Sequence, residues 1–180
     1  MSRGTAVTSA APEAELFADT VDSPIGPLTL VTDARTVCAL EFTDVEDRLT
    51  AQLARRFGRF VLRRRRDPLA VREKLDAYFA GDLHAIDAIA VNPGGTPFQQ
   101  EVWRALRKIP PGKTSSYGRL AARLGRPAAP RAVGRANALN PVAIIIPCHR
   151  LIGSDAGLTG YAGGVERKGW LLRHEGALPK

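Results

Sequence analysis

The residue pair best suited to catalysis is Cys148-His149, which follows an apolar run at residues 142–146 and Pro147. A free thiol has a pKa near about 8.5, so only a few per cent of it is thiolate at neutral pH. An imidazole that takes the thiol proton, directly or through water, raises that fraction. The sequence therefore predicts a nucleophilic Cys148 with His149 as its base, provided that the backbone turns sharply between them.

The residues alone leave alternatives to this interpretation. A buried, inert thiol is a common state of cysteine, and Cys38, inside an apolar segment, reads as such a core residue. A third group should orient the imidazole, and Glu175 is a candidate carboxylate that spacing alone does not select. The cysteines and histidines lack the spacing of a zinc site, so we expect no metal.

A helix-turn-helix pattern precedes the cysteine. The first helix begins after a capping Ser116 and ends at Gly125, and the second covers residues 130–139. Pro130 is acceptable there because the first turn of a helix has no hydrogen bond to lose. The exposed side is expected to carry Arg119, Arg123, Arg126, Arg131 and Arg135. The buried face of the second helix is expected to hold Ala132, Val133, Ala136 and Leu139. Its small residues, Ala128, Ala129, Ala132 and Gly134, would also let the backbone approach a groove closely.

Composition limits the classes of function. The 180 residues (19.4 kDa) carry 26 Lys and Arg against 18 Asp and Glu, a net charge of +8 that favours a polyanionic partner. Two cysteines cannot form a disulfide framework, so we expect a reducing compartment, the cytoplasm. The longest apolar run is far shorter than the roughly 20 residues that a membrane-spanning helix needs. The sequence therefore predicts no membrane association.

The remaining patterns predict an α+β fold in two domains. Residues 1–15 are expected to be a disordered tail, with folded structure beginning near Phe17. A small N-terminal α/β domain (16–91) would contain a hairpin at 28–31 and 36–42 and helices at 44–57 and 68–79. Turn residues make 92–95 the linker. A mostly helical C-terminal domain (96–180) would open with a helix capped by Thr96, with Gln99 completing the capping box.

Taken together, these segments resemble the O6-alkylguanine-DNA alkyltransferases, also called methylated-DNA–protein-cysteine methyltransferases. The matching segments in the second half are Thr96-Pro97-Phe98-Gln99, Val102-Trp103, Ser116-Tyr117-Gly118, Arg131-Ala132-Val133-Gly134, Asn140-Pro141, Pro147-Cys148-His149-Arg150, Gly160-Tyr161-Ala162-Gly163-Gly164, and Lys168, Leu171-Leu172 and Glu175. Weaker matches, Ser23-Pro24-Ile25-Gly26-Pro27-Leu28 and Tyr78-Phe79-Ala80-Gly81, fit the α/β domain of that family.

The resemblance implies a DNA repair reaction. The helix pair enters the minor groove of duplex DNA, Arg131 fills the space that an extruded O6-alkylguanine leaves, and Cys148 displaces guanine from the alkyl carbon. His149, held by Glu175, takes the thiol proton through water, while Tyr117 protonates the departing base. Asn140 braces the turn between the DNA-binding helix and the cysteine. The thioether is permanent, so each molecule reacts once, without a cofactor.

The resemblance also implies two groups of contact residues. DNA contacts would come from Ala129, Arg131, Ala132, Gly134, Arg135 and Tyr117. The substrate pocket would contain Asn137, Pro147, Arg150, Tyr161, Ala162 and Gly163. The protein is expected to act as a monomer that can cluster on DNA.

Some positions depart from the family pattern. Pro130 stands where small residues are usual, the Ala156-Gly157 pair shifts a glycine by one residue, and Ala162 lacks a hydroxyl. Two other functions remain open: a DNA-binding module without chemistry, and a cysteine hydrolase that uses Cys148 and His149. The hydrolase is disfavoured because the sequence supplies no oxyanion hole for an acyl substrate.

Overall fold

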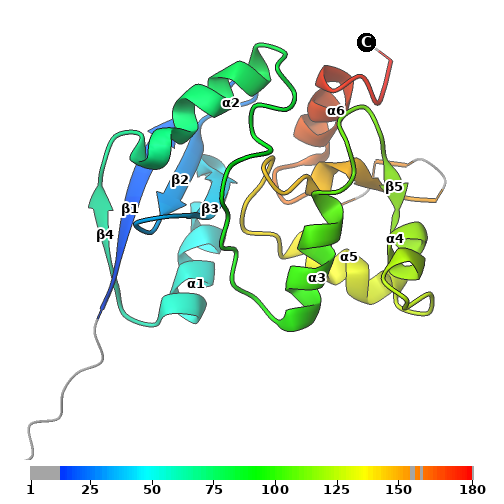
Figure 1. Cartoon of the computed structure of the whole chain (residues 1–180), viewed down its shortest axis with the longest axis horizontal. Helices are drawn as coiled ribbons and strands as arrows, with labels where there is room; N and C mark the ends of the chain where they lie inside the picture. Colours follow the sequence, from blue (N-terminus) through cyan, green and yellow to red (C-terminus); the bar gives the residue numbers. More distant parts are fainter. Residues whose placement is uncertain (1–12, 155–156, 159, 180) are drawn as a thin grey trace, which may run out of the picture.

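The computed structural model describes residues 13–154, 157–158 and 160–179 (Figure 1). A four-stranded sheet with helices forms the N-terminal half, and a mostly helical region forms the rest, which confirms the predicted α+β class. The strands are β1 (Ala14–Val21), β2 (Leu28–Thr32), β3 (Val37–Phe42) and β4 (Phe60–Arg64), in the spatial order β3-β2-β1-β4. The predicted hairpin is the antiparallel β2–β3 pair.

The start of the folded chain differs from the prediction. Strand β1 begins at Ala14, so the expectation of a disordered tail reaching residue 15 is wrong at its end. Ala14 pairs with Phe60 of the parallel strand β4, a partner that is distant along the chain. A parallel pairing of this kind leaves no local turn signal. Residues 1–12 of the predicted tail lie outside the described residues.

Two helices cover the sheet on opposite faces. Helix α1 (Glu46–Phe57) follows a 3₁₀ turn at Thr43–Val45 and packs Leu49 and Leu53 against one face. Helix α2 (Val71–Phe79) contributes to the main core on the other face. It begins three residues later than predicted, because Pro68–Ala70 forms a separate 3₁₀ turn.

The C-terminal half contains the predicted helices. Helix α3 (Pro97–Leu106) has the full capping box between Thr96 and Gln99. Helix α4 (Tyr117–Arg123) is capped by Ser116, whose hydroxyl accepts from the Arg119 main-chain N–H at 3.2 Å. Helix α5 (Pro130–Ala138) packs against α4, and Pro130 lies in its first turn. The remaining elements are β5 (Ser115–Ser116), the 3₁₀ turn η3 (Cys148–Arg150), β6 (Leu151–Ile152) and α6 (Val165–His174).

The outer edge of β3 joins the two halves. The Leu40 N–H donates to the Pro141 carbonyl at 2.9 Å, and the Ala143 N–H donates to the Leu40 carbonyl at 2.8 Å. The segment that leads to Cys148 is therefore tied to the sheet through main-chain hydrogen bonds. One hydrophobic cluster also contains residues from both halves. The division into domains at 92–95 stays a prediction.

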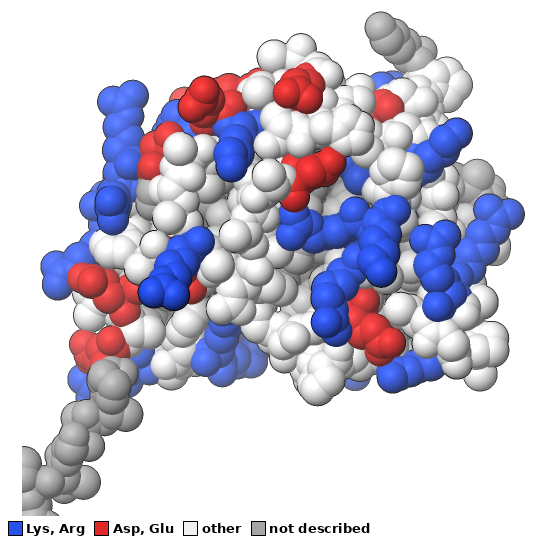
Figure 2. Space-filling model, in the orientation of Figure 1, with Lys and Arg blue, Asp and Glu red and all other residues white. Residues whose placement is uncertain are grey.

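The surface is rich in basic side chains (Figure 2). Lys and Arg residues gather over α3 and α4 and also along the β4 end of the sheet (Figures 1 and 2). None of the helices in the described residues is long and apolar enough to span a membrane.

Candidate active site

Cys148 begins the 3₁₀ turn η3 and lines a small pocket. The pocket is about 10 Å³, which is room for roughly one water molecule. Its wall consists of Glu41, Arg48, Asn137, Ala138, Asn140, Ala143, Cys148, Gly160, Tyr161, Ala162 and Gly163. The cysteine keeps 7% of its surface exposed, and the pocket that it lines lies at the C-terminal end of α5.

Burial determines the resting state of the thiol. Desolvation raises the pKa of Cys148 to about 11, and the negative charge of Glu41 adds to this. The Asn140 side chain and the charges of Arg48 and Lys168 act in the opposite direction but do not outweigh burial. The thiol is therefore protonated at neutral pH, and a reaction at the sulfur needs a base.

The imidazole of His149 is arranged to act as such a base. It is fully buried, and its Nε2 lies 2.9 Å from Oε1 of Glu175. Because an ionised carboxylate can only accept, Nε2 carries the hydrogen and Nδ1 has the free lone pair. Burial lowers the pKa of His149, which keeps the ring neutral. Nδ1 has no hydrogen-bond partner within the described part of the chain.

The backbone turns sharply at the cysteine, which was the condition for His149 as its base, but the turn does not bring the two side chains into contact. Residues 148–150 form the 3₁₀ turn, so the Cys148 and His149 side chains leave the backbone in different directions. Among the described contacts, none joins the thiol directly to the imidazole. Transfer of the proton through water, as the family resemblance implies, fits this arrangement.

Glu175 is the centre of a buried hydrogen-bond network. Its carboxylate accepts from Arg150 Nε and Nη2, both at 2.8 Å, and from the Tyr78 hydroxyl at 2.8 Å. Burial alone would raise the pKa of Glu175, but hydrogen bonds from His149 and Arg150 outweigh it and lower the pKa to about 2. The imidazole is therefore oriented by a permanently charged group.

Two asparagines support the cysteine segment. Asn140 donates to the Ile146 carbonyl at 2.8 Å and accepts from the Val142 N–H at 3.0 Å, so it braces the turn before Cys148. Asn137, the second asparagine, donates to the Cys148 carbonyl at 3.4 Å. Its Oδ1 is buried and has no partner in the described residues. An unused acceptor at a pocket wall suits a ligand that brings a donor.

Helix α5 presents a basic, small-residue surface. Arg131 and Arg135 are exposed, as are the three predicted arginines on and after α4. Ala132 was expected both in the buried face and at the groove; it is exposed, so the first expectation is wrong. Ala132 therefore lies on the exposed face of α5 with Arg131 and Arg135, and not on its buried face. Gly134 lies against the Tyr117 ring, where an added Cβ would meet ring carbons at 3.5 Å.

The structure gathers only part of the predicted site around the thiol. Asn137, Asn140, Tyr161, Ala162 and Gly163 lie in the pocket wall. Arg150, expected in the pocket, is instead buried behind it, where its guanidinium binds Glu175 and the Ile109 carbonyl. Pro147 and Tyr117 are also absent from the wall, and Tyr117 packs on α5. Ala156 lies outside the described residues.

Sequence reasoning missed three residues from the N-terminal half: Glu41, Arg48 and Tyr78. A signal existed for Glu41, because it is a charged residue inside the otherwise apolar strand β3. Nothing local marks Arg48 or Tyr78, since the carbonyls that Arg48 binds and the carboxylate that Tyr78 binds are 90 to 97 residues away.

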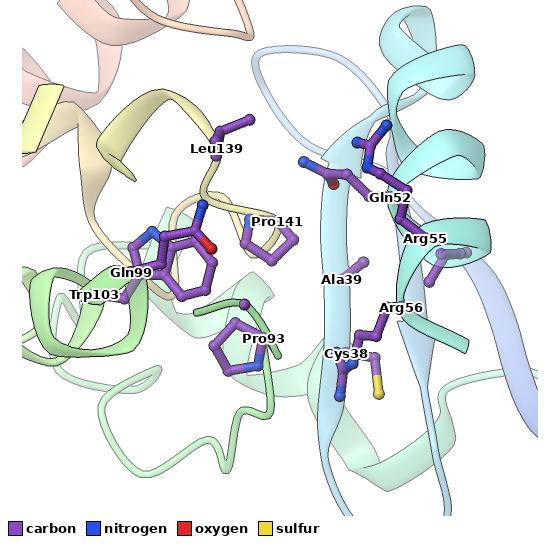
Figure 3. A pocket seen from close by; sticks show the side chains of 12 residues that line it. Cys38, Ala39, Gln52, Arg55, Arg56, Pro93, Gln99, Trp103, Leu139 and Pro141 are labelled. Carbon is purple, nitrogen blue, oxygen red and sulfur yellow. The ribbon is translucent and has the colours of Figure 1, made fainter. Parts of the chain in front are cut away.

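A larger cavity of about 360 Å³ lies beside the site, between α1 and β3 on one side and Trp103, Leu139 and Pro141 on the other (Figure 3). Cys38 lines it and is 1% exposed, which agrees with its interpretation as a core residue. Burial raises the pKa of its thiol too. Its sulfur donates to the Asp33 carboxylate at 3.6 Å and to the Thr36 carbonyl at 3.9 Å, and no imidazole contacts it among the described residues.

Comparisons with known proteins show the family of this chain. The family model described as 6-O-methylguanine DNA methyltransferase, ribonuclease-like domain, matches residues 16–93, and its DNA binding domain matches residues 97–177. A methylated-DNA–protein-cysteine methyltransferase of Salmonella typhimurium is 49% identical over 91% of this chain and 97% of its own length.

Solved structures give the same result. The O6-methylguanine methyltransferase of Mycobacterium tuberculosis is 39% identical, with a TM-score of 0.74 over 90% of this chain and 93% of its own. A structure of that organism's protein in complex with DNA is also 39% identical, with a TM-score of 0.74 over 91% and 94% of the two chains. The chain belongs to the family of methylated-DNA–protein-cysteine methyltransferases.

Proposed function

We propose that this protein repairs O6-alkylguanine in double-stranded DNA by transferring the alkyl group to the sulfur of Cys148. The observation that carries the proposal is the buried His149–Glu175 pair, which leaves Nδ1 without a partner in the described residues, on the residue that follows a pocket-lining cysteine. The names of the relatives support the same reaction. No other cysteine of the described chain has such a base.

The reaction breaks one bond and forms one. The thiol proton passes through water to His149 Nδ1, and the sulfur attacks the alkyl carbon in line with the bond to O6. A carbon–sulfur bond forms as the carbon–oxygen bond breaks, and guanine leaves with the bonding electrons. Tyr117 donates a proton to the base, because the guanine anion leaves poorly. The thioether remains on Cys148, so each molecule acts once and needs no cofactor.

Access to the sulfur requires two movements. Extruding a base from the duplex costs a few kcal/mol, and a damaged pair costs least. Arg131, exposed on α5, takes the place of the extruded base. The pocket has room for about one water, so the wall at residues 160–163 opens to admit guanine. Asn137 Oδ1, buried without a partner in the described residues, accepts from an N–H of the base.

The protein works in the cytoplasm. Both cysteines are free, and a reducing compartment keeps the acceptor thiol available.

Mass spectrometry of the reacted protein tests the proposal. Incubation with duplex DNA that contains O6-methylguanine should place one methyl group on the Cys148 peptide, in proportion to protein and without turnover. Cys38 is also a buried cysteine, so Cys38→Ser is the matched control and should react like the natural chain. DNA binding without methylation would favour a binding module, and modification of Cys38 would reject Cys148 as acceptor.

A further inference from the structure

Arg48 connects the N-terminal half to the end of the DNA-binding helix. Its guanidinium, on α1, donates to the Ala138 carbonyl at 2.6 Å and to the Asn140 carbonyl at 3.1 Å. Ala138 is the last residue of α5, and carbonyls at a helix C-terminus lack partners within the helix. A cation also interacts favourably with this end of the helix dipole. A side chain from one half thus completes a helix of the other.

Glu41 holds Arg48 in this position. The carboxylate belongs to β3, is 1% exposed, and lies 3.6 Å from Arg48 Nη2. Both side chains line the Cys148 pocket, and Asn140, whose carbonyl Arg48 binds, in turn fixes the Ile146 carbonyl two residues before the cysteine. The contacts therefore run from the sheet through Arg48 and Asn140 to the acceptor segment.

We propose that Glu41 and Arg48 are a positioning pair for alkyl transfer: Arg48 fixes the end of α5 and the Asn140 main chain relative to Cys148, and Glu41 keeps Arg48 there. The inference rests on the proposed transfer to Cys148. In this inference the N-terminal half helps to fix the distance between helix α5 and the sulfur of Cys148.

If Glu41 and Arg48 act on the thiol through their charges, removing either charge changes the thiol pKa. Residues with a packing role alone would not have this effect. Cys148 interacts electrostatically with Glu41 on β3, Arg48 on α1, Lys168 on α6 and Tyr161, and His149 follows it in the chain. Burial is the main cause of the raised thiol pKa, and Arg48 lowers it. Glu41 raises it further in its ionised form, which prevails above pH 7 because burial raises the pKa of this carboxyl to about 7. Neutralising the two residues one at a time should shift the thiol pKa in opposite directions.

The experiment compares full-length Arg48→Met, Glu41→Gln and Arg55→Met. Arg55 is an exposed arginine on the same helix that borders the larger cavity (Figure 3), which makes it the matched control. Single-turnover methyl transfer to Cys148 from O6-methylguanine duplex is measured at saturating protein across pH, and DNA affinity is measured separately. Arg48→Met should lower the saturating rate about 10- to 100-fold, because a displacement of about 1 Å has this effect, with little change in affinity.

The pH profiles complete the test. The rising limb should move to higher pH in Arg48→Met and to lower pH in Glu41→Gln, and Arg48→Lys, which keeps one donor, should recover part of the rate. The inference would be overturned if the rising limbs of the Arg48→Met and Glu41→Gln profiles stay in place or move in the same direction. It would also be overturned if Arg55→Met lowers the saturating rate as much as Arg48→Met does. Glutamine has the same shape as glutamate. The pH profile of Glu41→Gln therefore still tests the inference if Arg48→Met folds poorly. If the natural chain transfers no methyl group, the proposed function fails instead.

Discussion

Glu175 receives hydrogen bonds from His149, Arg150 and Tyr78, and all four groups are buried. Removing one partner of a buried charged network leaves the others without compensation. The carboxylate thus has two effects: it orients the imidazole for chemistry, and it stabilises the junction of α6, η3 and α2. At this scale, reactivity and stability depend on the same atoms.

Replacement of Glu175 by Gln should lower the activity and the stability at neutral pH, and should flatten the loss of stability that the natural chain shows in acid. Breaking such a network costs about 3–5 kcal/mol, and the misoriented imidazole should slow transfer. The folded pKa of Glu175 is about 2 against 4.5 in the unfolded chain. Its contribution is therefore complete above pH 4.5 and is lost as the pH falls toward 2. Urea unfolding as a function of pH measures this loss, and an unchanged acid limb in Glu175→Gln would contradict the assignment.

Tyr117→Phe tests the proton donor. The phenyl ring keeps the contact with Gly134 on α5, so DNA affinity should change little. The missing hydroxyl should slow methyl transfer about 10²- to 10⁴-fold, the usual contribution of general acid catalysis. Single-turnover kinetics on O6-methylguanine duplex supply the measurement. A rate equal to that of the natural chain would remove Tyr117 from the chemistry.

At the scale of elements, helices with local signals could be predicted and pairings between distant segments could not. The capping box at Thr96 and the Ser116 cap mark α3 and α4 in the sequence, and both helices are present. Strand β4 was missed, as was the start of β1 before Phe17, because these segments pair with each other across more than forty residues, whereas the end of β1 pairs with the neighbouring β2. The site residues also fall into those with a local sequence signal and those that depend on contacts between distant segments.

Motif spacing near the cysteine identified Cys148 and His149, and family resemblance added Glu175 and Asn140. The two charged residues of the wall, Glu41 and Arg48, come from β3 and α1. Their role depends on how the sheet packs against the 138–143 segment, and periodicity carries no information on such a contact. Arg150 was misplaced for a related reason, since its partner Glu175 is reached only when α6 folds back.

Arg131→Ala tests the role of α5 in extruding the base. Arg131 is exposed on this helix and is predicted to stabilise the duplex after the base has left it. The variant should therefore lose more activity on duplex DNA than on the free O6-alkylguanine base, which needs no extrusion. The ratio of the two second-order rate constants is the readout. Equal losses on both substrates would contradict this role.

At the scale of the whole molecule, the positive charge has two separate locations. One lies over α3 and α4, next to the exposed arginines of α5, and the other includes the arginines at the end of β4, on the opposite side of the molecule (Figures 1 and 2). Arg63 there pairs with Glu15 at 2.6 Å, on an exposed surface. DNA held by α5 in the minor groove would contact the first location only.

The salt dependence of DNA binding distinguishes the two locations. Each phosphate contact that is removed lowers the slope of log affinity against log salt concentration by about 1. Arg135→Ala on α5 should show this decrease, whereas Arg64→Ala on β4 should leave the slope unchanged. Fluorescence anisotropy with undamaged duplex at several salt concentrations gives both slopes. A comparable decrease in Arg64→Ala would extend the DNA footprint to the sheet.

The narrow pocket around Cys148 has a consequence for the lifetime of the unreacted protein. A molecule that reacts only once loses its function whenever an oxidant or a stray electrophile reaches its sulfur first. Peroxides and similar reagents attack the thiolate far faster than the thiol, and the resting sulfur is both protonated and almost enclosed. The fold thereby preserves its single equivalent of reactivity until the arrival of damaged DNA opens the way to it.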